Sequence, residues 1–193
     1  MANLSEMKTV SDQAAITDIY VLYLDDESHS FDGQTDKLLF PTTEAEVAAV
    51  LKHAYENGTP VTIQGARTGI TGAAVPMGGI TINLEKMDEM LFMEYSTDEG
   101  LYSIGGQAGV ILETLAKAIT TKALDELKGK GTPRQQEALK QFLNESDSYF
   151  FPIDPTEMTA LLGGIVACNA SGARTFKHGA VRNWVRRLRV VLA

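Results

Sequence analysis

A glycine-rich loop between two short apolar segments is the feature that most constrains how this chain can fold. Residues 61–84, VTIQGARTGITGAAVPMGGITINL, hold five glycines between VTIQ and ITINL. Glycine permits left-handed and close-approach backbone conformations, so several main-chain N–H groups can converge on one anion. Such a loop predicts either a diphosphate cradle or a connection that needs glycine only for its turns. The flanking segments, 61–64 and 80–84, are predicted strands.

The composition indicates a globular chain that can bury a core. Of its 193 residues, 44% are apolar, which suits one domain or two small lobes. No window is apolar enough for a membrane helix, and the N-terminus lacks the features of a secretory signal. The single cysteine, Cys168, has no partner for an internal disulfide. We therefore expect a cytoplasmic protein without a transmembrane segment, and peripheral attachment to the inner face of the membrane stays open.

The charge is unevenly distributed along the chain. The net charge is −8, yet residues 158–193 contain six lysines and arginines and no acidic residue. The overall acidity argues against general nucleic-acid binding. The basic stretch either binds an anion or pairs with acidic surface elsewhere on the chain. Its segment VRRLRVV alternates like a strand.

The first 40 residues form a separate N-terminal segment with a weak pattern. Five apolar and aromatic side chains suit one side of a short helix: Ile16, Ile19, Tyr20, Leu22 and Tyr23. An acidic turn follows, and its members imitate a metal site: Asp25, Asp26, Glu27 and His29. A polar loop with one histidine is more often only solvated, so we predict no metal here.

Residues 41–118 carry clearer signals. Thr43 and Glu46 have capping-box spacing, and a helix from there should end at Gly58 and Pro60. Segments 90–95 and 101–104 bracket the turn STDEG and predict a hairpin. A further helix begins near residue 110, after Gly105 and Gly106. The mixed order of strand, helix and hairpin predicts an α+β fold with a small βαβ-like lobe and a second mixed or antiparallel lobe.

The remaining residues divide into a helical stretch and a second small-residue motif. Residues 119–148 are polar and rich in helix formers, which predicts a solvated helical insertion. The motif FPIDPTEMTALLGGIVACNASGARTFKHGAVRN follows, where Thr156 or Thr159 can cap a helix. Gly163 and Gly164 within its apolar run allow another backbone or a flat ligand to approach closely. Two separate small-residue loops suit a long ligand with a diphosphate and a planar ring.

The common nucleotide-binding signatures are absent. The chain has no GxxxxGK[ST] motif, and GARTGITG lacks the opening Gly-x-Gly of GxGxxG. The loop also leads through Pro76 toward a strand, whereas the turn of a Rossmann fold enters a helix. A diphosphate site in this loop would therefore be of another type.

Three motifs in order carry a resemblance to a known family. PTTEAEV, VTIQGARTGITGAAVP and FPIDPTEMTALLGGIVACNASGARTFKHGAVRNWV resemble the FAD-binding domain of vanillyl-alcohol-oxidase-type, or p-cresol-methylhydroxylase-type, flavoproteins. Within that superfamily the chain is most similar to the D-lactate dehydrogenase and glycolate oxidase flavin-subunit group. The similarity covers about residues 36–118 and 149–193. It implies an oxidoreductase that binds FAD and acts on a small 2-hydroxy acid.

The resemblance also implies which residues bind FAD. The first loop would bind the diphosphate, and the second motif would line the ribityl chain and the isoalloxazine. The residues implied are Gly65, Ala66, Arg67, Thr68, Gly69, Thr71 and Gly72, with Ala73 nearby, and Pro152, Asp154, Gly163, Gly164, Ala167, Asn169, Ser171 and Gly172.

The chain departs from the family pattern at two places. The usual Gly-Gly-Gly-Thr-Gly core is replaced by residues 65–69, Gly-Ala-Arg-Thr-Gly. If Ala66 or Arg67 needs positive φ, a side chain there costs about 1 kcal/mol; alternatively, Arg67 neutralises the diphosphate. No histidine stands in the loop to attach the flavin, so we expect non-covalent FAD.

The second departure is the length of the chain, which ends at VVLA where family members continue. We expect residues 41–193 to be the N-terminal part of an FAD-binding domain whose substrate domain is absent. No catalytic residue is assigned, because the substrate-binding and proton-abstracting groups of the family belong to the absent part. The expected partners are the missing C-terminal region, or a complementary subunit, and the hydroxy acid. The alternative function is a non-catalytic module that acts in assembly.

Overall fold

The computed structural model describes residues 7–29 and 31–192. These residues form two compact units, which we call unit 1 and unit 2. Unit 1 comprises the described residues up to Met87 and those from Arg189 onward, and unit 2 runs from Asp88 to Leu188. One unit holds a mostly parallel sheet and the other an antiparallel hairpin, which confirms the α+β prediction. Residues 1–6 of the predicted N-terminal segment, and Ser30, lie outside the described residues.

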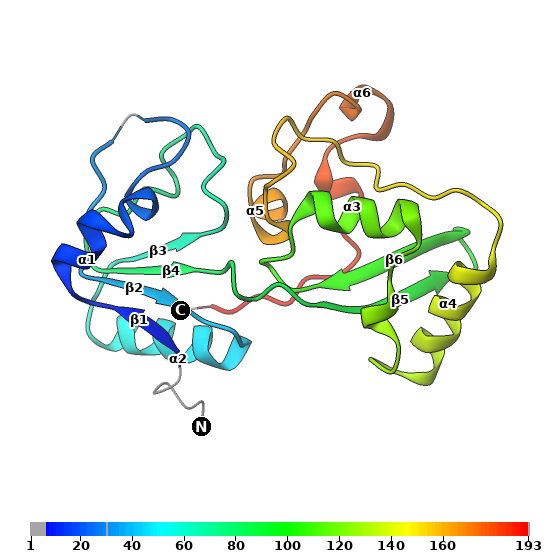
Figure 1. The fold of residues 1–193 in the computed structure, drawn as a ribbon, viewed down its shortest axis with the longest axis horizontal. Coiled ribbons are helices and arrows are strands. Elements are labelled where there is room, and N and C mark those ends of the chain that lie inside the picture. Colours follow the sequence, from blue (N-terminus) through cyan, green and yellow to red (C-terminus); the bar gives the residue numbers. More distant parts are fainter. Residues whose placement is uncertain (1–6, 30, 193) are drawn as a thin grey trace. The chain divides into compact units, whose positions relative to one another are not determined.

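Unit 1 is built on a four-stranded sheet in the order β1-β2-β4-β3 (Figure 1). Strands β2, β4 and β3 are parallel, and β1 pairs antiparallel with β2. Helix α2 connects β2 to β3, which gives the predicted βαβ-like lobe. Its elements are β1 (Lys8–Val10), α1 (Gln13–Asp18), the 3₁₀ turn η1 (Val21–Leu24), β2 (Lys37–Phe40), α2 (Glu44–Glu56), β3 (Val61–Gln64) and β4 (Ile80–Asn83).

Helix α2 begins at the predicted capping box. The Thr43 hydroxyl accepts the Glu46 N–H at 3.2 Å, and the Glu46 carboxylate accepts the Thr43 N–H at 3.1 Å. Val50 and Ala54 pack against Ile80 and Ile82 of β4 in a buried cluster. All four residues of β4 are buried, so this strand does not alternate between core and solvent. Strands of a parallel sheet are covered on both faces, which explains the continuous burial.

The first 40 residues contain more regular structure than their sequence pattern predicts. Strands β1 and β2 were not predicted, because each is short and neither alternates. The predicted helix side from Ile16 to Tyr23 was wrong: α1 ends at Asp18, Ile16 is buried, and Ile19 is 72% exposed. The chain turns instead so that Tyr23 packs edge-on against Phe40, with 5.2 Å between ring centroids.

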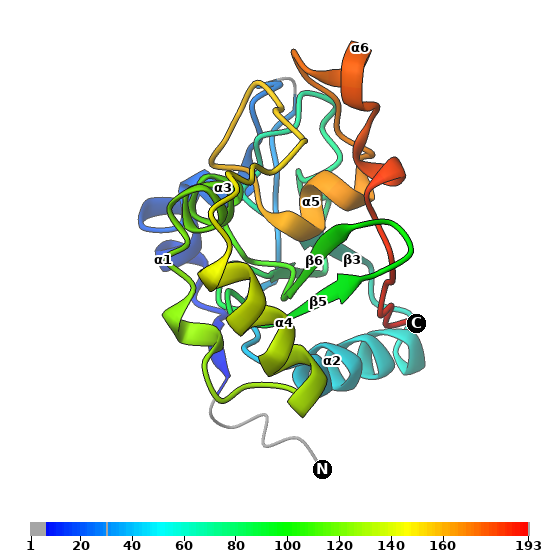
Figure 2. The same ribbon diagram turned by 90° about the vertical axis from the view of Figure 1, so that its right-hand side faces the viewer.

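Unit 2 centres on the predicted hairpin of β5 (Met90–Ser96) and β6 (Leu101–Gly106). Helices α3 (Leu112–Thr121) and α4 (Pro133–Asn144) bury their apolar sides in one cluster with this hairpin. Helix α4 lies alongside β5 (Figure 2). The other elements of unit 2 are η2 (Asp125–Leu127), α5 (Leu162–Ala167), α6 (Thr175–His178) and η3 (Val181–Asn183).

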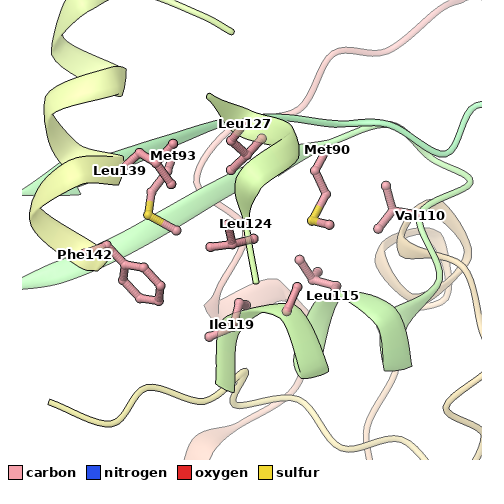
Figure 3. Packing of buried hydrophobic residues seen from close by; sticks show 10 residues of the cluster. Met90, Met93, Val110, Leu115, Ile119, Leu124, Leu127, Leu139 and Phe142 are labelled. Carbon is pink, nitrogen blue, oxygen red and sulfur yellow. The ribbon is translucent and has the colours of Figure 1, made fainter. Parts of the chain in front are cut away.

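Residues 119–148 were predicted to be a solvated helical insertion, but the apolar side chains of this segment are buried in the core. Leu124, Leu127, Leu139 and Phe142 are each at most 2% exposed. Figure 3 shows Leu124 between side chains from α4 and from α3. The segment is amphipathic: its polar residues face outward and its apolar residues pack into the core. The prediction missed this pattern because most residues of the segment are polar.

The C-terminal residues also differ from their pattern. Residues 186–192 form no strand, and among the described residues three of their arginines pair with acidic side chains. Arg186 contacts Glu99 at 2.8 Å, Arg187 contacts Glu94 at 2.5 Å, and Arg189 contacts Glu44 at 2.9 Å. Pairing with acidic surface is therefore the alternative that the structure supports for these three. None of the helices among the described residues combines the length and apolar character needed to cross a membrane.

Candidate functional site

The glycine loop of unit 1, residues 65–79, leaves the carboxyl end of β3 and returns to the start of β4. Since these two strands are parallel neighbours, the loop must travel back along the sheet before β4 begins. Its last glycine is required by packing: Gly79 has φ +70, and a Cβ there would lie 2.3 Å from the Pro60 carbonyl oxygen. The glycines at 78 and 79 thus make the return turn.

A buried amide side chain holds the two arms of the loop together. The Gln64 side chain is fully buried, and its Nε2 donates to the carbonyl oxygens of Tyr23 and Ala74, each at 2.7 Å. The Asn83 Nδ2 donates to the Gly65 carbonyl at 3.1 Å. The sequence prediction missed both side chains. The signal that could have found them is a polar residue at the carboxyl end of each of two neighbouring apolar strands.

The main-chain carbonyls and the main-chain N–H groups of the loop differ in their hydrogen bonding. Its carbonyls at Gly65, Arg67, Gly72 and Ala74 accept hydrogen bonds from the protein. In contrast, no main-chain N–H from residue 66 to 74 donates to an acceptor in the described part of the chain. Residues 65–74 themselves are half-buried or exposed. Unused N–H groups along a half-buried or exposed loop are suited to binding an anion.

Arg67 is the loop residue that departs furthest from the family pattern. Of the two positions at which a side chain was expected to be costly, it is the one with positive φ, at +62. Its guanidinium carbon lies 4.2 Å from the centroid of the Tyr23 ring, and Nη1 donates to the Gly65 carbonyl at 3.3 Å. Burial, together with the Glu85 carboxylate, raises the pKa of Tyr23 to about 12. The phenol is therefore neutral beneath the arginine at neutral pH.

The predicted flavin-lining residues lie in unit 2, and packing within the protein explains two of their glycines. A Cβ on Gly163 would lie 2.7 Å from the Ala108 Cβ, and the Gly163 N–H donates to the Ala108 carbonyl at 2.8 Å. A Cβ on Gly172 would lie 1.7 Å from the Asp154 carbonyl oxygen. Gly172 pairs in a β-bridge with Pro155. Both glycines are needed for close backbone contact within the unit.

Two other predicted glycines have no such explanation. A Cβ on Gly69 in unit 1, or on Gly164 in α5, would meet no atom of the described residues within 4 Å, apart from its sequence neighbours and, for Gly164, the backbone of its own helix. Glycine inside a helix costs about 1 kcal/mol relative to alanine, so Gly164 is not there for the stability of α5. Open space beside an unexplained glycine is consistent with a ligand that approaches the backbone.

The end of α5 leads into a turn of unusual backbone conformation. Asn169 has φ +47, and its Oδ1 accepts the Arg182 N–H at 3.1 Å. Cys168, which precedes it, is a free thiol and is exposed. The predicted helix cap at Thr156 or Thr159 was wrong: α5 is preceded by Leu161 and has no side-chain cap, and Thr159 hydrogen-bonds to Glu157 at 2.7 Å.

A basic hollow opens beside the second motif. It has a volume of about 540 Å³ and is lined by Phe150, Ala173, Arg174, Lys177 and His178. Arg174 forms an ion pair with Asp154, at 3.3 Å from its Nε, so one predicted flavin residue is tied to the rim of the hollow. Positive charge and an aromatic ring together suit an anion with a planar part.

In the acidic turn that imitates a metal site, His29 forms an ion pair with Asp25. His29 Nδ1 lies 2.6 Å from the Asp25 carboxylate on the surface. The side-chain hydrogen bond from Asp25 raises the pKa of His29. Throughout residues 7–29 and 31–192, no three His, Cys, Asp or Glu side chains gather closely enough to hold a metal ion.

The fold of the chain is similar to that of a solved enzyme. A crystallised alkyldihydroxyacetonephosphate synthase aligns with 91% of this chain and 31% of its own length, at a TM-score of 0.63 and 16% identity. The two proteins thus share a fold over this length, in agreement with the α+β prediction. The alignment extends through both units, and the sequence identity is too low to say more than the fold.

The sequence comparisons agree with the fold. Residues 35–125 match the family model described as "FAD binding domain". A D-lactate dehydrogenase of Anaerostipes hadrus is 39% identical over 161 residues, which is 83% of this chain and 28% of the relative. The glycolate oxidase subunit GlcD of Bacillus subtilis is 25% identical over 90% of this chain and 31% of its own length. The chain thus spans less than a third of the length of these relatives.

These findings support FAD as the cofactor, and each unit, taken by itself, contains residues that suit one part of it. In unit 1 the unused amides of residues 66–74 match the acceptor oxygens of a diphosphate. In unit 2 the open side of Gly164 leaves room for a flat group. The chain therefore provides residues that suit parts of an FAD site.

Proposed function

We propose that this chain is the FAD-binding part of an oxidoreductase that oxidises a 2-hydroxy acid of the D-lactate or glycolate type. The unused amides of residues 66–74 carry the proposal, because they form a surface for a diphosphate. The names of the two relatives, D-lactate dehydrogenase and glycolate oxidase subunit, support the substrate class. When bound, the flavin accepts the electrons that the hydroxy acid loses.

The chain's own residues bind and orient the cofactor in this proposal. Main-chain N–H groups of residues 65–72 hold the diphosphate. The hydrogen bond from the Gln64 side chain to the Ala74 carbonyl holds the two arms of the loop together. Gly164 admits the flat ring, while Gly163 and Gly172 fix the backbone around it. Binding is non-covalent. The residues proposed to contact FAD are those implied by the family resemblance: 65–69, 71, 72, 152, 154, 163, 164, 167, 169, 171 and 172.

Titration of the purified chain with FAD tests the cofactor proposal. The fluorescence of FAD should change on binding in a saturable manner, and release by heat should return intact FAD. A Cβ at position 69 would meet no atom within 4 Å other than its sequence neighbours, so Gly69→Val adds bulk on the open side of the loop. It should weaken FAD binding by about tenfold or more. A wild-type chain that does not bind FAD, or a G69V chain that binds it equally well, would contradict the proposed site.

The substrate class needs a separate experiment. We propose that a C-terminal region, or a complementary subunit, such as the longer relatives possess, supplies the groups that hold the acid. Protein containing both parts should lose the visible absorbance of oxidised flavin when D-lactate or glycolate is added without oxygen. If neither acid causes this loss of absorbance, the proposed substrate class is rejected, while the proposed FAD site is unaffected.

A further inference from the structure

Arg67 combines a backbone conformation that side chains disfavour with a side chain fixed against its own loop. Its φ of +62 lies in the left-handed region, where glycine is favoured. The other left-handed positions of this loop, at 72, 78 and 79, are glycines. A side chain kept at such a position provides something that glycine cannot.

Three contacts hold Arg67 in place. Its guanidinium lies over the face of Tyr23, its Nη1 donates to the Gly65 carbonyl, and its own carbonyl accepts the Glu27 N–H at 3.2 Å. The first contact is a cation–π interaction, which fixes the direction of the side chain. The second brings the positive charge back toward the start of the loop, where the unused amides begin.

Tyr23 is itself held by contacts that do not involve Arg67. Its hydroxyl donates to the Glu85 carboxylate, with 3.1 Å to each oxygen, and its carbonyl accepts from Gln64. Its ring packs against Phe40. The aromatic platform is therefore in place before any ligand binds, so the arginine is pre-organised.

The guanidinium keeps most of its hydrogen-bonding capacity. It has five N–H donors, and within residues 7–29 and 31–192 it donates to the Gly65 carbonyl alone. No carboxylate of those residues pairs with it at ion-pair distance. A cation without a carboxylate partner, beside a row of unused amides, adds charge to a site that otherwise offers only neutral donors.

We propose that Arg67 binds the diphosphate of FAD and that Tyr23 positions it to do so. Arg67 is then the binding residue and Tyr23 the positioning residue of a cationic clamp, which replaces glycine in the family pattern. The inference rests on the proposed FAD site and deepens it. The clamp makes this loop depend on the negative charge of the diphosphate more than a loop of neutral amides does.

The dissociation constant of FAD, measured on the chain with Arg67→Gly and Arg67→Lys, tests the clamp. R67G removes the positive charge and relieves the backbone strain at this position. If Arg67 is only a costly side chain at positive φ, R67G should bind FAD at least as well as the wild type, whereas the clamp predicts the opposite. The clamp predicts binding weaker by about tenfold or more, with less dependence on salt than in the wild type. The affinity of R67K for FAD should lie between those of R67G and the wild type, because lysine keeps the positive charge but lacks the planar, two-pronged set of N–H donors of the guanidinium.

R67G binding FAD as tightly as the wild type would overturn the clamp, and wild-type binding in the same assay would leave the proposed function standing. Failure of the wild type to bind FAD would instead reject the proposed function itself. For the positioning role, Tyr23→Leu should weaken FAD binding and Tyr23→Phe should not, since Phe keeps the ring. Equal binding by Y23L and Y23F, with both folded by circular dichroism, would reject Tyr23 as the positioning residue.

Discussion

At the scale of single residues, the glycines of the two motifs serve different purposes. Gly163 and Gly172 make close contacts with backbone or Cβ atoms of their own unit, so packing alone explains them. Gly69 and Gly164 face open space, so packing does not explain them. The distinction separates glycines that maintain the fold from glycines available to a ligand, which no sequence pattern could do.

Substitution of the helical glycine tests this distinction. Gly164→Ala should stabilise the free chain by up to about 1 kcal/mol, because alanine is the better helix former. The same change should weaken FAD binding, since the added methyl occupies the open side. Gly163→Ala is the matched control and should destabilise the chain, because its Cβ would lie 2.7 Å from the Ala108 Cβ. Thermal unfolding and FAD titration of both variants measure the effects, and a G164A chain that binds FAD normally would contradict the assignment.

At the scale of elements, local signals predicted the parts that depend on neighbouring residues. The capping box of α2, strand β3 and the β5–β6 hairpin were confirmed, because each follows from turn or cap chemistry close in sequence. Strands β1 and β2 were missed, since pairing between distant segments forms them. The predicted strand at the C-terminus was wrong: residues 186–192 pair with no strand, and Arg186 and Arg187 form ion pairs with acidic side chains.

The candidate site was predictable to a similar degree. Glycine spacing indicated the loop, but the residues that hold it in shape come from elsewhere in unit 1. Tyr23 lies 44 positions before Arg67 in the chain, and Asn83 lies on the next strand. The contact between Tyr23 and Arg67 depends on tertiary packing, which a single sequence does not encode in any local pattern.

The cap of α2 gives a prediction at this scale. The Glu46 carboxylate accepts the Thr42 and Thr43 N–H groups at 2.7 and 3.1 Å. Burial acts to raise the pKa of Glu46, but these hydrogen bonds outweigh it and lower the pKa below its usual 4.5. Its contribution to stability is thus present above about pH 4.5 and is lost as the pH falls through the lowered value.

Glu46→Gln should therefore reduce the free energy of unfolding at neutral pH, by about 1 kcal/mol. The loss should shrink as the pH falls below 4.5, because the wild type then loses the same ionised acceptor. Denaturant unfolding at several pH values measures it. Glu56→Gln at the exposed end of the same helix is the control and should have little effect, since surface ion pairs contribute little. A constant difference between wild type and E46Q at all pH values would refute the cap's ionic character.

At the scale of the whole molecule, each unit has a core made from its own residues. One buried cluster joins Met7, Val50 and Ile82 in unit 1, and another joins Met93, Leu115 and Phe142 in unit 2. The segment 119–148, which we still propose to be an insertion, supplies part of the second core. Each unit is thus expected to respond to damage in its own core.

Phe142→Ala tests this expectation. Phe142 is 1% exposed, so its truncation should cost about 3–5 kcal/mol in unit 2. Hydrogen exchange followed by mass spectrometry should then accelerate in residues 88–188 more than in residues 7–87. Lys140→Ala, on the exposed side of the same helix, should change exchange little. Equal acceleration in both units would show that they unfold together.

The solitary thiol gives the chain a built-in attachment point for a reporter. Cys168 is exposed and immediately precedes Asn169 in the motif proposed to line the flavin. One maleimide dye per molecule will therefore attach at a known position without any engineering of the sequence. If the emission of the dye overlaps the absorbance of flavin, energy transfer quenches the dye when flavin binds. The fluorescence of this single site can then report flavin binding.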